Sequence, residues 1–227
     1  MSGSFVTPET RSKVRGLMTP IAVALGRLGL TPNGLTLIGF GIAIIAAALA
    51  AAQLWLPAGL LVLFGGVFDL FDGALARATG KASPLGAFMD STFDRWGEGI
   101  VYIGIAWGAV SLGVEAVVVL TAAAMTAAFM VSYTRAKSES LGFAPGTGMA
   151  NVGLAPREVR IVILTIGLVA AGLLPGFPTD ASGAGAAALP PNVIALELAL
   201  GLIAVLGTIT TIQRIVVTTN QARHEQG

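Results

Sequence analysis

Six long apolar segments dominate the chain, and each is close to the roughly 20 residues that a helix needs to cross the hydrocarbon core of a bilayer. They cover residues 33–53, 57–78, 84–110, 115–136, 157–175 and 192–214. Their ends carry residues typical of helix boundaries. Between the second and third segments, Gly80 can end a helix, Ser83 can cap the next one, and Pro84 can take its first position. The pattern predicts an all-α membrane protein with six transmembrane helices.

A further segment, residues 8–29, precedes these runs and mixes basic with apolar residues. Its basic residues are Arg11, Lys13, Arg15 and Arg27, among Val14, Leu17, Met18, Ile21, Val23, Leu25 and Leu28. This mixture predicts an N-terminal amphipathic helix that lies in the membrane interface, with a kink at Pro20; a soluble N-terminal arm is the alternative. We therefore expect an interfacial helix over residues 1–30, a six-helix domain over 31–218 and a cytoplasmic tail over 219–227.

The composition agrees with a bilayer environment. Hydrophobic residues make up 55% of the 227 residues and charged residues only 11%, whereas soluble domains carry about 25% charged residues. The net charge of +1 gives no indication of nucleic-acid binding. The absence of cysteine excludes disulfides and thiolate chemistry, and the single histidine, His224, lies in the tail and argues against a histidine-based site.

The basic residues indicate the orientation of the spans. If the six segments alternate across the membrane, all 13 Lys and Arg residues fall on the side that holds both termini. The opposite side carries only the acidic residues Glu115, Asp180 and Glu197. Because positively charged loops stay in the cytoplasm, we expect a multi-pass protein of the cell membrane with both termini cytoplasmic.

Four aspartates stand near the cytoplasmic ends of two neighbouring segments. Asp69 and Asp72 are three residues apart at the end of the second segment, and Asp90 and Asp94 are four apart at the start of the third. Each pair shares one helix face, with Cβ atoms about 5–6 Å apart. Charges inside apolar spans are costly and usually functional, so these ends are the predicted functional site.

Converging carboxylates repel each other unless cations lie between them. An all-oxygen ligand set favours Mg²⁺ or Mn²⁺, and four carboxylates favour two ions about 3.5–4 Å apart. The alternative is that the aspartates form buried salt bridges with Arg77 and Arg95, which would leave an excess of negative charge. We therefore predict a metal site formed by Asp69, Asp72, Asp90 and Asp94.

Residues 69–94 read DLFDGALARATGKASPLGAFMDSTFD. The spacing D-x2-D-G-x2-A-R-x8-G-x3-D-x3-D resembles the signature of the CDP-alcohol phosphatidyltransferases without departure. Six spans after an interfacial helix are also what that family has, so the resemblance extends over most of the chain.

This resemblance implies a six-helix bundle, usually a homodimer, that acts on a CDP-linked lipid. Asp69, Asp72 and Asp90 would be metal ligands that hold the diphosphate. Asp94 would complete the second metal site and act as general base on the acceptor hydroxyl. The nucleotide pocket would be shaped by Gly73, Ala76, Arg77 and Gly86. Asn33 and Thr36 could contact the nucleotide, with capping of the first span as the alternative.

A second cluster bears on the acceptor. Ser132, Arg135 and Lys137 end the fourth segment, and Arg157 and Arg160 open the fifth on the same side of the membrane. Hydroxyl and basic side chains near a helix N-terminus suit a phosphate dianion. The alternative is anchoring to lipid head groups, the role expected for Arg214 and Arg223. We predict that Ser132, Arg135, Arg157 and Arg160 bind the acceptor phosphate.

This cluster and the opening TPNGLTLIG, residues 31–39, resemble the phosphatidylinositol phosphate synthases of actinobacteria and their archaeal relatives. Two departures are Arg135, where many relatives have lysine, and Pro156, which precedes the arginines rather than lying between them. The expected reaction is transfer from CDP-diacylglycerol or a related CDP-lipid to inositol phosphate, with release of CMP. One alternative is glycerol 3-phosphate as acceptor. A divalent-cation transporter is more remote, because it would place carboxylates near mid-membrane.

Overall fold

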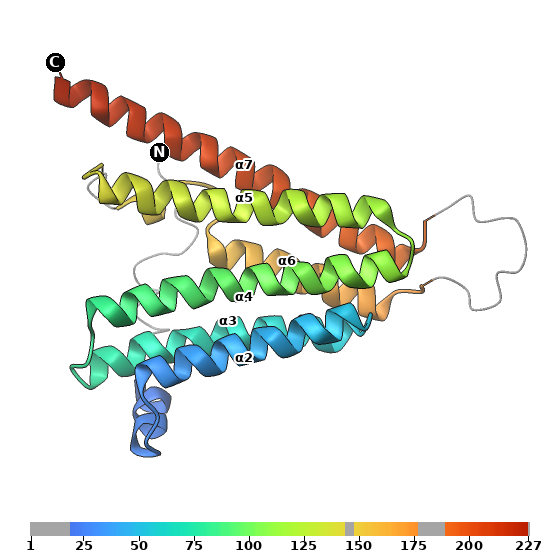
Figure 1. Cartoon of the computed structure of the whole chain (residues 1–227), viewed down its shortest axis with the longest axis horizontal. Helices are drawn as coiled ribbons and strands as arrows, with labels where there is room; N and C mark the ends of the chain where they lie inside the picture. Colours follow the sequence, from blue (N-terminus) through green and yellow to red (C-terminus); the bar gives the residue numbers. More distant parts are fainter. Residues whose placement is uncertain (1–18, 144–147, 177–188, 227) are drawn as a thin grey trace, which may run out of the picture.

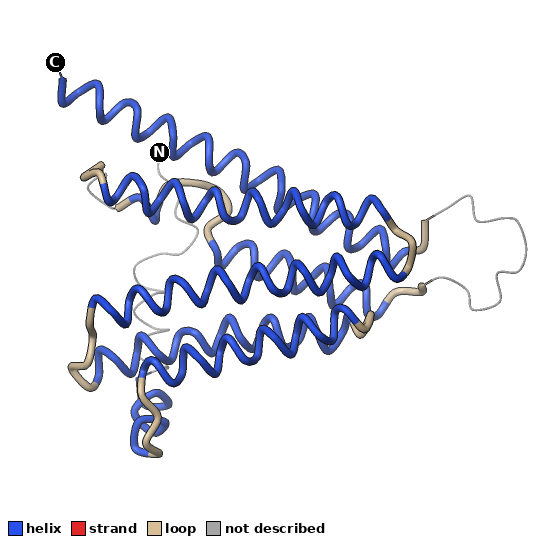
Figure 2. Tube along the Cα trace, in the orientation of Figure 1, coloured by secondary structure: helices blue, strands red, loops and turns tan. Residues whose placement is uncertain are grey.

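The computed structural model describes residues 19–143, 148–176 and 189–226, and these ranges contain only helices and their connections (Figure 2). Residues 19–27 are helical and precede the long helices. The long helices are α2 (Pro32–Ala51), α3 (Trp55–Ala78), α4 (Pro84–Ser111), α5 (Glu115–Ser140), α6 (Arg157–Leu173) and α7 (Pro191–Gln226), with a short 3-10 helix, η1 (Met149–Asn151), before α6. The all-α prediction is confirmed.

The helix boundaries follow from local chemistry. Thr31 caps α2 by accepting a hydrogen bond from the Gly34 amide at 3.1 Å, so neither Asn33 nor Thr36 is the cap. Ser83 caps α4 in the same way, and Pro84 takes its first position, as predicted. Gly80 follows the end of α3 with φ +66°, a conformation that glycine adopts without strain.

The helices pack side by side around one large apolar core. Tyr102, Ile105, Leu168, Leu200 and Ile203 are fully buried in it, from α4, α6 and α7. In Figure 1, α2, α3 and α4 form one part of the bundle, α5 and α7 another, and α6 lies between them. The close approach of α2 and α4 requires glycine, because a Cβ at Gly104 would lie 2.2 Å from the Ala47 carbonyl oxygen.

Four of the helices are long and apolar enough to cross a membrane: α2, α3, α5 and α7 up to Arg223. Among the described residues, four of the six predicted spans are therefore confirmed as helices of membrane-spanning length and hydrophobicity. Of the other two predicted spans, α4 carries Asp90, Asp94, Arg95 and Glu98, and α6 has 17 residues with charges in its first turn. Both nevertheless have the predicted place in the bundle (Figure 1).

Both ends of the described chain are helical. The predicted boundary at residue 218 falls inside α7, which continues to Gln226, so the tail is not a separate segment. Helical residues 19–27 stand at a large angle to α2 near the turn between α3 and α4 (Figure 1). Ala22 is fully buried there, in a small cluster with Leu35 and Leu75. The kink predicted at Pro20 depends on residues outside the described range.

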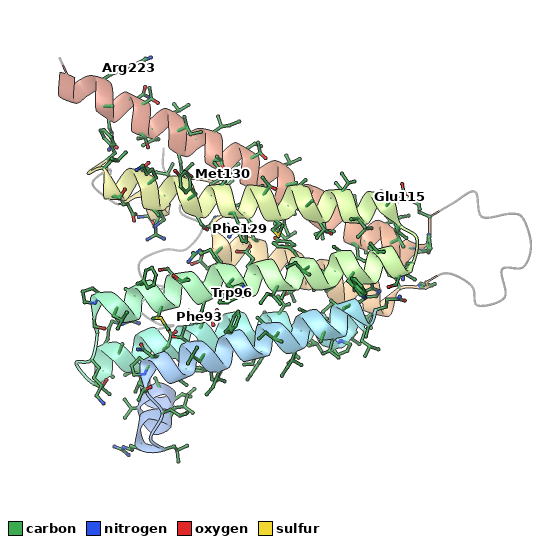
Figure 3. The ribbon with its side chains drawn as sticks, in the orientation of Figure 1. Phe93, Trp96, Glu115, Phe129, Met130 and Arg223 are labelled. Atoms are coloured by element: carbon green, nitrogen blue, oxygen red, sulfur yellow. The ribbon has the colours of Figure 1, made fainter. Side chains whose placement is uncertain are left out.

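The two ends of the bundle differ in charge. The turn between α3 and α4, the start of α2 and the last turns of α5 and α7 lie toward one end (Figure 1). Figure 3 labels Arg223 at that end and Glu115 at the other. The helices thus alternate in direction as the sequence pattern requires, and the predicted functional residues gather toward the basic end.

Candidate active site

Arg157 bridges aspartates of two different helices. Its Nη2 lies 2.6 Å from Asp69 Oδ2 on α3, and its Nη1 lies 3.0 Å from Asp94 Oδ2 on α4. All three side chains are mostly enclosed, with 21%, 18% and 14% of their surface exposed, respectively. The structure thus brings Asp69 and Asp94 together, as the motif predicts, and places Arg157 directly between them.

The connection before α6 fixes the position of Arg157. Thr210 on α7 is fully buried, and its Oγ1 accepts hydrogen bonds from the amides of Leu154 and Ala155 at 3.0 and 2.9 Å. Gly153 has φ +115°, and a Cβ there would lie 2.1 Å from Thr210 Cγ2. This tight contact attaches the chain to α7 immediately before Arg157, which is the first residue of α6.

Asp72 is held by two local donors. Thr36 Oγ1 donates to Asp72 Oδ2 at 2.8 Å, and the Gly73 amide donates to Asp72 Oδ1. Both Thr36 and Asp72 are buried. The structure therefore connects Thr36 with a predicted metal ligand. Asn33 lies beside the start of α4, where a Cβ at Gly86 would be 3.5 Å from Asn33 Oδ1.

Gly39 is a site residue that we did not predict from the sequence. A Cβ at this position would lie 2.7 Å from Asp69 Oδ1, closer than a Cβ atom and a non-bonded oxygen approach each other in proteins. The absence of a side chain on α2 therefore lets the Asp69 carboxylate lie against that helix. Its position at the end of the TPNGLTLIG stretch was the available signal.

The four predicted metal ligands influence one another electrostatically. Asp72 interacts with Asp69 and Asp90, and Asp94 interacts with the same two residues. Within the described part of the chain, no three acidic side chains are arranged closely enough to hold a metal ion together. The donor set nevertheless suits a hard divalent cation, because its members are all carboxylates and a positive group already lies between two of them.

Other motif residues lie near the aspartates. Arg77 is exposed, and its guanidinium lies over Gly73, where an added Cβ would be 3.1 Å from Nη1. Ala76 is half-buried on the same helix. These positions are compatible with the nucleotide role that the family resemblance implies for Gly73, Ala76, Arg77 and Gly86, which stays a prediction.

The predicted acceptor cluster divides into two groups. Ser132 belongs to the site, because its Oγ accepts a hydrogen bond from Arg95 Nε at 3.1 Å and Arg95 Nη1 lies 3.7 Å from Asp94 Oδ2. Arg135 is more exposed and pairs with Glu139 one turn further along α5, at 3.1 Å. Arg95 therefore connects Asp94, the general-base candidate, with Ser132, whose hydroxyl is predicted to bind the acceptor phosphate. This link was not predicted from the sequence.

Arg160 has a different partner from the one predicted. Its Nε and Nη2 donate to the two Glu98 carboxylate oxygens at 2.8 Å each, and its Nη1 donates to the Ala155 carbonyl. Because every guanidinium nitrogen is occupied and the side chain is only 1% exposed, this geometry does not offer Arg160 to an acceptor phosphate. Glu98, four residues after Asp94, could have been found as a further charge inside an apolar span.

The expectation that Arg214 anchors to lipid head groups is wrong. The residue is 3% exposed, and its side chain donates to the backbone carbonyls of Val152 and Val131. These two hydrogen bonds connect α7 with α5 and with the segment before α6.

A pocket opens beside Asp69 and Asp94. Its polar lining consists of Thr36, Asp69, Asp94, Glu98 and Arg157, and the rest of its walls are apolar residues and glycines of α2, α3, α4 and α6. Phe40 and Phe93 line it and pack edge to face, with ring centroids 5.0 Å apart. Figure 3 labels Phe93 and Trp96 on α4. A polar end joined to apolar walls suits a ligand that has both characters.

Comparison with known proteins identifies the family. Residues 29–220 match the CDP-alcohol phosphatidyltransferase family. The chain is 40% identical over 158 residues to archaetidylinositol phosphate synthase of Pyrococcus horikoshii. The aligned region covers 70% of this chain and 79% of that protein. It is 36% identical over 211 residues to phosphatidylinositol phosphate synthase of Mycolicibacterium smegmatis, which covers 91% and 85%.

Solved structures agree with this assignment. The crystal structure of Mycobacterium tuberculosis phosphatidylinositol phosphate synthase with CDP-DAG bound is 30% identical, has a TM-score of 0.73 and covers 88% of this chain and 92% of its own. The same synthase in complex with manganese and citrate gives a TM-score of 0.72 at 29% identity, with 88% of each chain covered. The chain is therefore a multi-pass membrane enzyme that belongs to the CDP-alcohol phosphatidyltransferase family.

Proposed function

We propose that this enzyme transfers the phosphatidyl group of CDP-diacylglycerol, or of a related CDP-lipid, to a hydroxyl group of inositol phosphate. The products are phosphatidylinositol phosphate and CMP. The observation that carries this proposal is the contact of Arg157 with Asp69 and Asp94. It places a strong phosphate-binding group at the carboxylates that would hold the donor, as a phosphorylated acceptor requires.

The aspartates would hold the reactive diphosphate. Asp69, Asp72, Asp90 and Asp94 supply the oxygen ligands for Mg²⁺ or Mn²⁺, with two ions expected. When bound, such ions neutralise the diphosphate and the departing CMP. Thr36 and the Gly73 amide keep the Asp72 carboxylate in place. Preorganised charge of this kind is the main requirement of phosphoryl transfer.

Asp94 is the proposed general base. The acceptor hydroxyl oxygen attacks the phosphorus that carries the diacylglycerol, and the bond from this phosphorus to the CMP oxygen breaks. The hydroxyl proton passes to the Asp94 carboxylate, and CMP leaves with the electron pair of the broken bond. The Asp94 side chain is 14% exposed and lines the pocket, so it can reach a bound hydroxyl.

The acceptor phosphate would be bound by Arg157 and Ser132, with Arg135 at the more exposed rim. Arg95 holds Ser132 at 3.1 Å and would add positive charge to the same place. A guanidinium can form two parallel hydrogen bonds with phosphate, which fixes the orientation of the acceptor. An uncharged acceptor such as free inositol would offer these groups no phosphate to bind.

The membrane arrangement suits a lipid donor. The pocket is lined by Asp69 and Asp94 and also by many apolar residues, which would accept hydrocarbon. The helix ends that carry these aspartates lie toward the basic end of the bundle. We expect this end, and both termini, to face the cytoplasm, where the nucleotide is released. A homodimer remains an expectation from the family resemblance.

An acceptor screen tests the proposal. Purified enzyme with CDP-diacylglycerol and Mg²⁺ is offered inositol 1-phosphate (the 1L, or 3-phosphate, form), glycerol 3-phosphate, serine or free inositol, and CMP release is measured. We expect release with the inositol phosphate alone. Release with glycerol 3-phosphate alone would replace the proposed product with phosphatidylglycerophosphate. The matched control is Asp94→Asn enzyme, which should give no release with any acceptor.

A further inference from the structure

Arg157 pairs with two carboxylates that are themselves predicted metal ligands. One guanidinium nitrogen pairs with Asp69 Oδ2 at 2.6 Å and another with Asp94 Oδ2 at 3.0 Å. A divalent ion held by Asp69 and Asp94 would bring a second positive charge to the carboxylates with which Arg157 already pairs. Because two cations repel strongly in an enclosed site, metal binding must break or weaken at least one of these pairs.

Between the aspartates, the Arg157 guanidinium does not form all of its possible hydrogen bonds. Its Nε is buried and lacks a hydrogen-bond partner among the described residues. Unpaired buried donors are unfavourable, so the guanidinium has a reason to move when a ligand offers a better arrangement. Arg95 adds to this, because its positive charge lies near the same Asp94 oxygen, 3.7 Å away, and repels Arg157.

We propose that Arg157 competes with the divalent metal for Asp69 and Asp94, and that displacement by the metal makes its guanidinium available to the acceptor phosphate. Acceptor binding then follows metal loading. This inference rests on the proposed function for the identity of the acceptor, but the competition itself concerns only this chain and the metal.

The mechanism has a thermodynamic consequence with a definite sign. If the metal displaces Arg157 toward the acceptor phosphate, metal must strengthen acceptor binding, and acceptor must strengthen metal binding by the same factor. Removing the Arg157 charge must have opposite effects on the two ligands. Metal binding becomes tighter because a competitor is lost, and acceptor binding becomes weaker because a phosphate ligand is lost.

The first experiment measures Mn²⁺ binding to the full-length protein in nanodiscs without substrates, from the electron paramagnetic resonance signal of free Mn²⁺. We expect Arg157→Gln to bind Mn²⁺ more tightly than wild type by about 5- to 150-fold, the range typical of coupled sites. The matched control is Arg223→Gln, because Arg223 is exposed in the last turns of α7 and should leave Mn²⁺ affinity unchanged. Unchanged or weaker Mn²⁺ binding by Arg157→Gln would overturn the proposal. Should that variant not fold, Arg157→Ala must give the same tightening.

The second experiment measures binding of inositol phosphate calorimetrically, at saturating Mn²⁺ and with chelator. Wild type should bind more tightly with Mn²⁺, and Arg157→Gln should lose most of both the affinity and the metal dependence. Equal wild-type affinity under the two conditions would contradict ordered binding. Failure of the proposed function is distinguishable, because the acceptor screen would then favour another acceptor while the Mn²⁺ titration, which contains no acceptor, would still decide the competition.

Discussion

Arg160 and Glu98 form a two-point ion pair inside the bundle, with both donor–acceptor distances at 2.8 Å and side chains only 1% and 5% exposed. The pair connects α6 to α4 about one helical turn after Arg157 and Asp94, which carry the proposed chemistry. It converts two charges that would be unfavourable separately into one neutral connection between helices.

Removing one member of this pair should destabilise the fold. We expect Glu98→Gln to lower the free energy of unfolding by about 3–5 kcal/mol, because it leaves a buried positive charge without compensation. Thermal unfolding in detergent would measure the loss. The double variant Glu98→Leu with Arg160→Met should recover most of it and keep a KM for inositol phosphate near that of wild type. A large rise in the KM for inositol phosphate would show that Arg160 contributes to acceptor binding.

Gly39 should be required for activity rather than for stability. An alanine there would place its Cβ 2.7 Å from Asp69 Oδ1 and displace this carboxylate. We expect Gly39→Ala to lower kcat by about 10- to 100-fold, as small displacements of reacting groups do. Gly41→Ala is the matched control, since nothing lies within 4 Å of its added Cβ. Equal kcat values for the two variants would show that Asp69 does not depend on this close approach.

The Thr36 hydroxyl should tune metal affinity through Asp72. Thr36→Val keeps the shape of the side chain but removes the donor that lies 2.8 Å from Asp72 Oδ2. Loss of a group that orients a metal ligand typically weakens metal binding by about 10- to 100-fold. A Mn²⁺ titration would detect this, and Thr36→Ser should behave like wild type. If the Thr36→Val and Thr36→Ser variants bind Mn²⁺ with equal affinity, the Thr36 hydroxyl serves another purpose, such as a nucleotide contact.

Asp94→Asn should separate chemistry from donor binding. Asparagine can still accept a hydrogen bond from Arg157 but cannot take the hydroxyl proton, so we expect CMP release to fall by at least about 100-fold. Metal-dependent binding of the CDP-lipid, measured calorimetrically, should be largely retained. Turnover close to wild type would reject Asp94 as the base, and loss of lipid binding would assign it to the metal alone.

The sequence indicated which residues matter in the motif but not how they pair. The spacing of Asp69 and Asp94 placed them at neighbouring helix ends, and their shared contact with Arg157 agrees with this. No local pattern could predict that Arg157 would face the aspartates while Arg160, one helical turn later, faces Glu98. Their side chains point in directions set by how α6 packs between α3 and α7, which depends on contacts distant in the sequence.

Hydrophobic pattern and turn residues alone determined the helical elements, their order and their alternation in direction, because helix boundaries depend on local chemistry such as the Ser83 cap. The motif of eight fixed positions in residues 69–94 likewise determined the family. Only the tertiary structure decided that Arg214 is buried and that Gly39 makes room for Asp69. It also decided that Arg157 lies in the site and Arg160 in the core. The physical reason is that burial and ion pairing depend on which helix faces meet, and one sequence pattern is compatible with several such arrangements.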